Sequence, residues 1–189
     1  VSSTSAMTGV INSQGVFFFV DTHVQEDPSV EQIVESTLQA AYRMKLFGIE
    51  PKVALLSHSN FGSHDSKDAL KMRQVREQLL KRNPRLNVDG EMQGDTAWDE
   101  ALREKLLPNS TLKGRANLFV LPNLEAANIA YSLVRVFTDG VAIGPILMGI
   151  SKPVHILTSS ASSRRVLNMT AIAAVDAQIR KQMEAERGT

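Results

Sequence analysis

The chain has 189 residues, 43% of them hydrophobic, and this length and composition suit a single well-buried core. Its 21 lysine and arginine residues nearly balance 20 acidic residues, so it has no strong field of one sign to hold nucleic acid or an anionic membrane surface. The absence of cysteine excludes disulfides and thiolate chemistry, and with no apolar run near the roughly 20 residues of a membrane span, the sequence fits a soluble, cytoplasmic protein.

Short apolar runs alternate along the chain with longer segments of helical period, which is the pattern of βα units around a mainly parallel sheet. The first five residues lack an initiator Met and the features of a signal peptide, so we expect an internal start. The predicted strands cover residues 15–21, 52–57, 116–121, 141–147 and 154–158, while residues 87–89 are too short to assign. The predicted helices are one capped by Asp27 that ends at Gly48, then 67–82, one after Asp95, 125–137, and 163–183 with Ile172, Val175, Ile179 and Met183 on one face.

A polar turn follows the predicted strand at 52–57. In an open α/β sheet, ligands bind beyond the carboxyl ends of the strands, where backbone N–H groups are free. This turn is rich in hydroxyl groups and has a glycine that lets the backbone approach a ligand closely. Its candidate contacts are Ser57, Ser59, Phe61, Gly62 and Ser63. It predicts a phosphate cradle, although an ordinary polar turn explains the same pattern.

A second strand exit opens the predicted helix at 125–137 with small residues, which leaves room for a ligand. Its candidate contacts are Asn123, Ala126, Asn128 and Tyr131. On periodicity alone, Asn123 is better explained as a helix cap.

The third exit places hydroxyl groups before two arginines in the first turn of the last helix. Its candidate contacts are Thr158, Ser159, Arg164 and Arg165. Arginine has the wrong sign for a helix N-terminus, which already carries partial positive charge. A bound phosphate would remove the conflict, but side chains that reach solvent or a nearby carboxylate would also do so.

Several other kinds of site are not indicated. The four histidines are dispersed without the spacing of a metal pair, so we expect no metal site in the chain. The glycine-rich dinucleotide motif, the phosphate-loop lysine motif and the serine-hydrolase elbow are all absent.

At these strand exits the sequence resembles phosphate acetyltransferases, and more closely the phosphotransacetylase-like domain at the C-terminus of hybrid NADP-dependent malic enzymes. The motifs are VFFFVDTHV, VALLSHSNFGS, VDGEMQGD, LFVLPNLEAANIAY, AIGPILMGISKPVHILT and VLNMTAIAAVDAQ, in this order along nearly the whole chain. The resemblance implies a three-layer α/β/α fold with a mainly parallel sheet, like that of isocitrate dehydrogenases. It also implies a CoA-type ligand in a cleft, and that residues 1–189 are the C-terminal portion of one such domain.

The resemblance also marks departures at the reaction centre. Active members carry Leu-Ser-Arg-Gly-Cys-Ser-Val-Glu-Asp after Lys-Pro-Val, and their serine, arginine and aspartate match Thr158, Ser159 and Arg165 here. Transfer to CoA needs a base near the thiol, and a guanidinium cannot accept that proton. Serine in place of arginine also removes a bidentate donor for acetyl phosphate. Further departures are Ser132 and Ala127, where relatives carry lysine and often glycine. We therefore expect no catalytic residues.

Three hypotheses remain open. The first is a regulatory domain that binds acetyl-CoA or CoA, forms a homo-oligomer of at least two chains, and acts on malate oxidation in another domain, where NADP and a divalent metal would bind. The second is an active phosphate acetyltransferase that uses Asp95 or His58 as its base. The third is an assembly domain that binds no metabolite.

Overall fold

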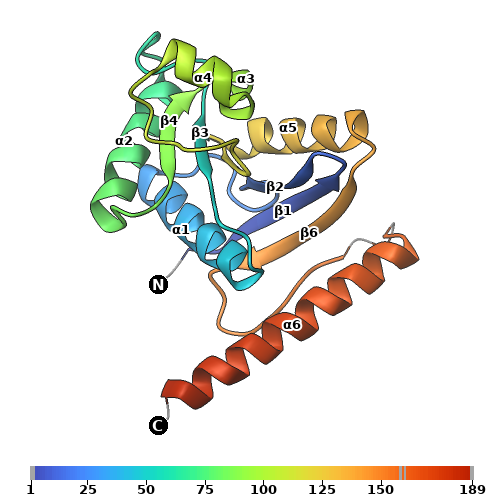
Figure 1. Ribbon diagram of the computed structural model, residues 1–189. Coiled ribbons are helices and arrows are strands. Elements are labelled where there is room, and N and C mark those ends of the chain that lie inside the picture. Colours follow the sequence, from blue (N-terminus) through green and yellow to red (C-terminus); the bar gives the residue numbers. More distant parts are fainter. Residues whose placement is uncertain (1–2, 158, 160, 188–189) are drawn as a thin grey trace.

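The computed structural model describes residues 3–157, 159 and 161–187. Its strands are β1 (Ser5–Asn12), β2 (Gly15–Val20), β3 (Val53–Leu56), β4 (Val88–Met92), β5 (Leu118–Val120) and β6 (Val141–Met148). Its helices are α1 (Val30–Leu46), α2 (Lys67–Arg82), α3 (Gly94–Trp98), α4 (Glu100–Leu106), α5 (Leu124–Phe137) and α6 (Ser163–Arg187). Figure 1 shows their arrangement.

One sheet organises the described part of the chain, with strand order β4-β3-β5-β2-β1-β6. The pairs β2–β5, β3–β5 and β3–β4 are parallel, whereas β1 is antiparallel to both of its neighbours, β2 and β6. All strands except β1 therefore point the same way, and their carboxyl ends lie along one edge of the sheet.

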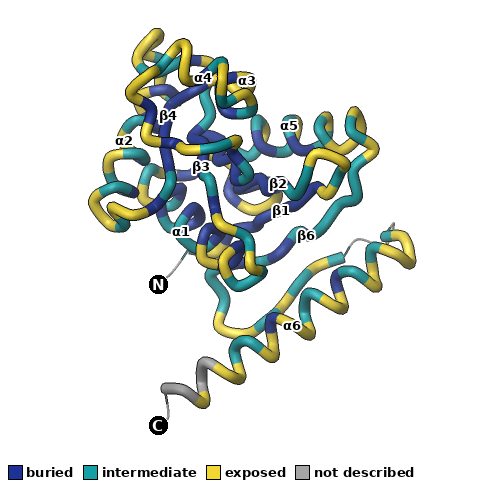
Figure 2. The backbone as a smooth tube through the Cα atoms, in the orientation of Figure 1, coloured by how far each residue is buried: buried dark blue, intermediate teal, exposed yellow. Residues whose placement is uncertain are grey.

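Helices cover both faces of this sheet, as the three-layer prediction requires. Helices α1 and α2 pack on one face over a core that includes Val34, Met72 and Leu55. Helices α3 and α5 pack on the other face over a core that includes Phe19 and Tyr131, and α4 packs against α3. Figure 2 shows the buried strands between the two helical layers. Along the described residues, no helix is both long and apolar enough to cross a membrane.

The predicted helix starts are partly correct. Helix α2 spans the predicted residues and is capped by Ser66, whose hydroxyl accepts from the Ala69 N–H. For α1 the predicted Asp27 cap is wrong, because Ser29 forms a capping box with Gln32. Asp27 instead accepts hydrogen bonds from two lysines, Lys67 at 3.0 Å and Lys71 at 2.8 Å. The helix predicted after Asp95 is two short helices, since Asp99 ends α3 and caps α4.

The strand predictions failed at both ends of the chain. Strand β1 was not predicted, because its β-branched residues, Thr8, Val10 and Ile11, stand among small residues and a glycine that weaken the strand pattern. The predicted strand at 154–158 is wrong for the described residues, where only an isolated bridge joins His155 to Ile146. Pro153 precedes this segment and has no N–H to extend a ladder.

Helix α6 runs beside the edge strand β6, outside the compact body of the sheet and its covering helices (Figure 1). Among its described side chains, those of Met169 and Asp176 are buried and that of Ile172 packs against the core, whereas Val175 is exposed. The predicted apolar face is therefore wrong at Val175. Ile179 is half-buried, and the side chain of Met183 lies outside the described ones. Asp176 pairs with Arg43 of α1 and ties α6 to that helix.

Candidate functional site

The turn after β3 is built around a buried carboxylate from β4. Glu91 is 1% exposed, and its Oε1 accepts from the Ser59 hydroxyl at 2.7 Å and from the Gly62 N–H at 2.8 Å. The backbone carbonyl of Glu91 also accepts from the Phe61 N–H at 2.8 Å. Two of the donors predicted to face a phosphate thus already serve a carboxylate of the chain itself.

The charge of Glu91 is held by this turn and by α2. Burial alone would raise the pKa of Glu91, but hydrogen bonds from Arg73, Gly62 and Ser59 outweigh it and lower the pKa below its ordinary value. The Arg73 Nε lies 3.1 Å from Glu91 Oε2. The remaining hydroxyls bond within the turn: Ser57 accepts from the Ser59 N–H and Ser63 from the Asn60 N–H.

At the start of α5, Asn123 is a helix cap. Its Oδ1 accepts from the Ala126 N–H at 2.9 Å, and its Nδ2 lies 3.3 Å from the Asp68 carboxylate. Tyr131 is buried, with its ring edge-on to Phe19 at 6.1 Å between centroids. The sequence had favoured the capping role of Asn123, and the structure confirms that role.

A polar cluster lies where β1, β2 and α5 meet. The Thr8 and Thr22 hydroxyl oxygens are 2.6 Å apart, and the Thr22 hydroxyl lies 2.7 Å from Nδ1 of His23. Asn128 of α5 donates from its amide to the Thr22 carbonyl at 3.2 Å. The two threonines therefore fix the His23 ring by one nitrogen, while the residue itself is exposed.

Two charged groups act on His23. Burial of part of the ring lowers the pKa of His23, the Asp21 carboxylate acts to raise it, and the positive charge of Arg165 lowers it further. Burial also raises the pKa of Asp21, although its carboxylate accepts from the N–H groups of His23, Val24 and Gln25. His23 is therefore mostly neutral at pH 7 and is electrostatically coupled to the start of α6.

The start of α6 supplies the two predicted arginines. Arg165 donates to the Gly144 carbonyl at 3.0 Å, and its Nε is buried without a hydrogen-bond partner among the described residues. Arg164 and Ser159 are exposed. The prediction for Thr158 lies outside the described residues.

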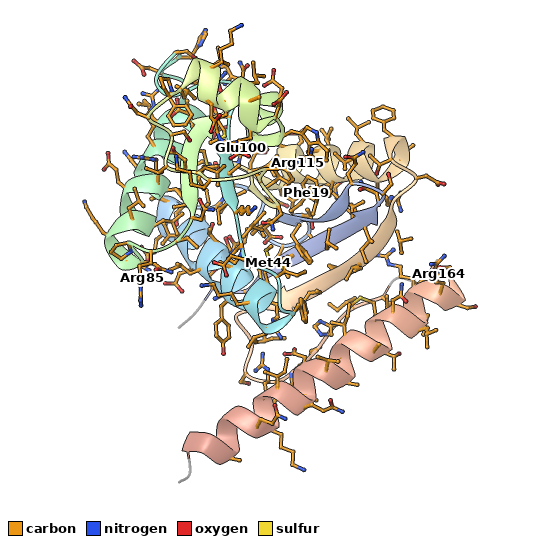
Figure 3. All side chains as sticks on the ribbon, viewed as in Figure 1. Phe19, Met44, Arg85, Glu100, Arg115 and Arg164 are labelled. Carbon is orange, nitrogen blue, oxygen red and sulfur yellow. The ribbon has the colours of Figure 1, made fainter. Side chains whose placement is uncertain are left out.

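These arginines line a cavity of about 330 Å³ between the start of α6 and the end of α5. The described lining residues are Arg135, Gly140, Val141, Ala142, Ser162, Arg164, Arg165 and Asn168. Three of them are arginines and none is acidic. Figure 3 shows Arg164 at the start of α6, at the side of the molecule where α5 turns into β6.

The structure brings together only some of the predicted site residues. Asn128 and Arg165 are linked through Thr22 and His23, whereas the turn after β3 is built into β4 and α2 through Glu91 and Arg73. Of the two bases considered from sequence, His58 lies on that turn, with its ring 5.3 Å from that of His64. Asp95 lies in the first turn of α3, where it accepts from the Thr96 N–H.

Sequence reasoning missed His23, Thr22, Thr8 and Arg135. His23 and Thr22 follow β2 directly, so the rule applied to three other strand exits would have found them at a fourth. Thr8 gave no signal because its strand was not predicted, and Arg135 none because it lies at the far end of α5. Over the described ranges, no cluster of three or more acidic or histidine side chains could hold a metal ion.

Comparison with known proteins adds a family to this geometry. A family model described as phosphate acetyl/butaryl transferase matches residues 1–174. The NADP-dependent malic enzyme of Salmonella typhimurium is 52% identical over 179 residues, which cover 94% of this chain and 24% of that protein. The phosphate acetyltransferase of Bacillus subtilis is 34% identical over 177 residues, which cover 94% of this chain and 55% of that protein.

A solved structure agrees with these matches. A phosphotransacetylase from Streptococcus pyogenes superposes with a TM-score of 0.88 at 33% identity, over 94% of this chain and 54% of that one. The chain thus spans 24% of the length of the malic enzyme and about half the length of the two phosphotransacetylases.

Proposed function

Because the chain belongs to the phosphate acetyl/butaryl transferase family, we propose that it is a regulatory domain that binds acetyl-CoA or CoA without turning it over. The observation that carries this proposal is the cavity at the start of α6, where Arg164 and Arg165 have no carboxylate among the described lining residues. CoA carries phosphate groups that such guanidinium groups recognise by paired hydrogen bonds.

The lack of turnover rests on Arg165 and Ser159. In active members of the family, the position of Arg165 holds an aspartate and that of Ser159 an arginine. A permanently protonated guanidinium cannot take the proton of a thiol, and a neutral hydroxyl cannot neutralise the charge of acetyl phosphate. Thr158, where active members carry serine, is the third substituted position of this segment.

The remaining candidate contacts take secondary parts in the proposal. We assign Asn128 and Tyr131 contacts from α5, and Asn123 and Ala126 contacts from the start of that helix. We assign Ser57, Ser59, Phe61, Gly62 and Ser63 only an outer contribution, because Glu91 already holds Ser59 and Gly62.

The regulated reaction in this proposal is the NADP-dependent oxidative decarboxylation of malate to pyruvate, in another domain of the same protein. The support is the 52% identity to a malic enzyme of which this chain matches 24%. The proposal includes a cytoplasmic homo-oligomer, this chain as the C-terminal portion of its phosphotransacetylase-like domain, and NADP and a divalent metal bound only outside it. Regulation requires two states of the protein that differ in affinity for acetyl-CoA.

Calorimetric titration of acetyl-CoA into the full-length protein tests the site. Arg165→Ala should weaken binding by about 10- to 100-fold, since hydrogen bonds to a charged group contribute about 1.5–3 kcal/mol. Arg85→Ala, at an exposed arginine of the α2–β4 connection, is the control and should leave the affinity unchanged. Unchanged affinity in Arg165→Ala would reject the arginine site. If acetyl-CoA at high concentration shows no binding and does not raise the unfolding temperature, a pure assembly domain is the better explanation.

A second candidate function, an active phosphate acetyltransferase, is favoured by one observation. His23 is neutral, is oriented at Nδ1 by Thr22, and is coupled electrostatically to Arg165, so it could accept the thiol proton that position 165 cannot. His23 replaces Asp95 and His58 as the base of that hypothesis. Acetyl phosphate formation that is lost in His23→Gln but kept in His58→Gln would establish it, and no product above a no-enzyme control would dismiss it.

A further inference from the structure

Helix α6 is attached to the rest of the fold by few buried side chains. Met169 is buried and Ile172 packs against the core, but both lie in the first half of the helix. Further along α6, the buried group among the described side chains is the carboxylate of Asp176, which is 1% exposed. The connection from β6 runs back beside α6 before the helix begins (Figure 1). The attachment of α6 beyond Ile172 therefore depends on the groups around Asp176.

Two arginines lie beside the Asp176 carboxylate. Arg43 of α1 forms a buried ion pair with Oδ1 of Asp176, and Nε of Arg180, one turn later on α6, lies 3.6 Å from the same oxygen. Arg180 also donates to the carbonyl oxygens of Ile150 and Ser151, at 3.2 Å and 2.7 Å, in the connection between β6 and α6. These contacts join α1, α6 and the connection around one carboxylate.

A histidine is enclosed beside this carboxylate. His155 lies in the same connection, where its backbone bridges to Ile146 of β6, and its side chain is 4% exposed. Its Nε2 is 3.8 Å from Oδ2 of Asp176, which is too far for a hydrogen bond. Neither ring nitrogen of His155, nor Oδ2 of Asp176, has a hydrogen-bond partner among the described residues. The ring is therefore buried next to a carboxylate to which it is not hydrogen-bonded.

The surroundings of His155 oppose its protonation. Two guanidinium groups and one carboxylate give the cluster one net positive charge when the ring is neutral, and a proton on the ring adds a second. Burial lowers the pKa of His155, the Asp176 carboxylate acts to raise it, and the charges of Arg43 and Arg180 lower it further. Strand β6 itself carries no ionisable residue. A proton on His155 thus places a charge where it has neither water nor a hydrogen-bonded partner.

We propose that Arg43, His155, Asp176 and Arg180 form a pH-sensitive latch, in which neutral His155 lets α6 pack against β6 and protonation of His155 releases α6. The charged ring regains water when the connection and α6 move away from β6, which relieves both its burial and its repulsion by the two arginines. Released α6 takes with it the arginines at its start. The latch itself is independent of the proposed function, and only its effect on acetyl-CoA binding rests on that function.

The direction of the pH dependence follows from the lowered pKa of His155. Above the ordinary value of 6.5 the ring is neutral whether α6 is closed or open, so the latch has its full stability. As the pH falls from 6.5 towards the lower value of the closed state, the open state binds the proton more tightly, and opening becomes more favourable. The pKa values of Asp89 and Glu91 lie below 3.8 and 4.5, so these carboxylates do not titrate in this range. His23 also has a lowered pKa and serves as the matched control.

Hydrogen–deuterium exchange of the full-length protein at pH 7.5, 6.5 and 5.5 tests the latch, with uptake corrected for the intrinsic exchange rate at each pH. Peptides that cover α6 should show at least about 3-fold more opening at pH 5.5 than at pH 7.5, whereas peptides that cover α2 should not change. His155→Gln, which is neutral at every pH, should remove this dependence, and His23→Gln should keep it. Circular dichroism at pH 7.5 checks that the variants fold, and His155→Asn is the second variant at this position.

Each outcome of the exchange experiment decides the proposal. Opening of α6 in acid that requires His155 supports the latch. Greater protection of α6 in acid would mean that protonated His155 pairs with Asp176, and would overturn the release. Equal opening in wild type and His155→Gln, no opening in wild type, or a dependence that disappears in His23→Gln would reject His155 as the sensor.

Acetyl-CoA titrations at the same pH values separate the latch from the proposed function. The affinity should fall as α6 opens, and His155→Gln should keep the affinity of pH 7.5 at pH 5.5. If α6 opens in acid through His155 but acetyl-CoA binds at no pH, the acyl-CoA function fails and the latch stands. If acetyl-CoA binds equally at every pH while α6 opens, the effect of the latch on the ligand is overturned.

Discussion

Two polar segments of this chain look alike in sequence but differ in structure. The turn after β3 and the segment before α6 are both rich in serine and both open toward a helix. In the turn, Ser59 and Gly62 bind Glu91, and Arg73 neutralises that carboxylate. At the start of α6, Arg164 and Arg165 line a cavity with no acidic residue among its described lining. The donors of the first segment are hydrogen-bonded to other groups of the chain, whereas the second segment still has donors for a ligand.

The comparison teaches that a polar loop is a ligand site only to the extent that the chain leaves its donors unused. A buried carboxylate that accepts from three donors takes the place of the water that would hydrate them. An incoming phosphate would have to displace this carboxylate from its donors. A phosphate that binds an arginine cluster without a carboxylate has no such group to displace. We therefore expect mutations in the turn to change stability, and mutations at the start of α6 to change binding.

The largest expected effect on stability is at Glu91. Glu91→Gln keeps the shape but removes the charge that Arg73, Gly62 and Ser59 stabilise, so the free energy of unfolding should fall by about 2 kcal/mol. Urea denaturation measures this change. Glu77→Gln, at an exposed glutamate of α2, is the control and should stay within about 0.5 kcal/mol of wild type. If the free energy of unfolding fell in both variants, or in neither, the turn after β3 would not have the structural role that distinguishes it from the start of α6.

Acid should act on the two buried carboxylates of β4, Asp89 and Glu91. The pKa values of Asp89 and Glu91 are both lowered in the folded chain, because their hydrogen bonds outweigh the effect of burial. Carboxylates with lowered pKa values stabilise the fold above their ordinary values of 3.8 and 4.5, and this contribution is lost as the pH falls through the folded values. Unfolding free energies at pH 7, 4.5 and 3 should therefore drop mainly below pH 4.5. Glu91→Gln should flatten the drop; an unchanged profile would argue against the assigned role of Glu91.

The smallest expected effect has the opposite sign. Arg164→Glu places an acidic residue in the first turn of α6, as in the other five helices, and should raise the free energy of unfolding by about 0.5 kcal/mol. The same change should weaken acetyl-CoA binding, because it puts a negative charge in the cavity. Thermal unfolding and calorimetry on one preparation measure both effects. A destabilised variant would mean that Arg164 has a structural role.

Much of the fold could be predicted because strong local signals agree with the tertiary structure. Helix α2 carries Met72, Val75 and Leu79 at helical spacing behind a serine cap, so both of its ends were predicted. Strand β1 could not be predicted, because its pairing with β2 and β6 depends on distant residues rather than on its own composition. The predicted face of α6 failed at Val175 because α6 packs by Met169 and ties to α1 through Asp176.

The candidate site was less predictable than the fold. Arg164 and Arg165 stood out because their sign is wrong for a helix start, which is a local property. The role of Glu91 could not be predicted, since nothing in the sequence shows that β4 buries it beside the turn after β3. His23 follows β2 directly and could have been found by the strand-exit rule, whereas Arg135 belongs to the site only because the end of α5 lies beside the start of α6.

The central claim is that the chain binds acetyl-CoA and does not transfer its acetyl group. Because the chain has no cysteine, any thiol that forms in a mixture of chain, acetyl-CoA and phosphate must come from released CoA. The most direct measurement is a calorimetric titration with acetyl-CoA, followed by assay of free thiol after incubation with phosphate. The account predicts saturable binding that depends on Arg165, with no thiol above the no-protein control. Thiol release with turnover, or the absence of any binding, would contradict it.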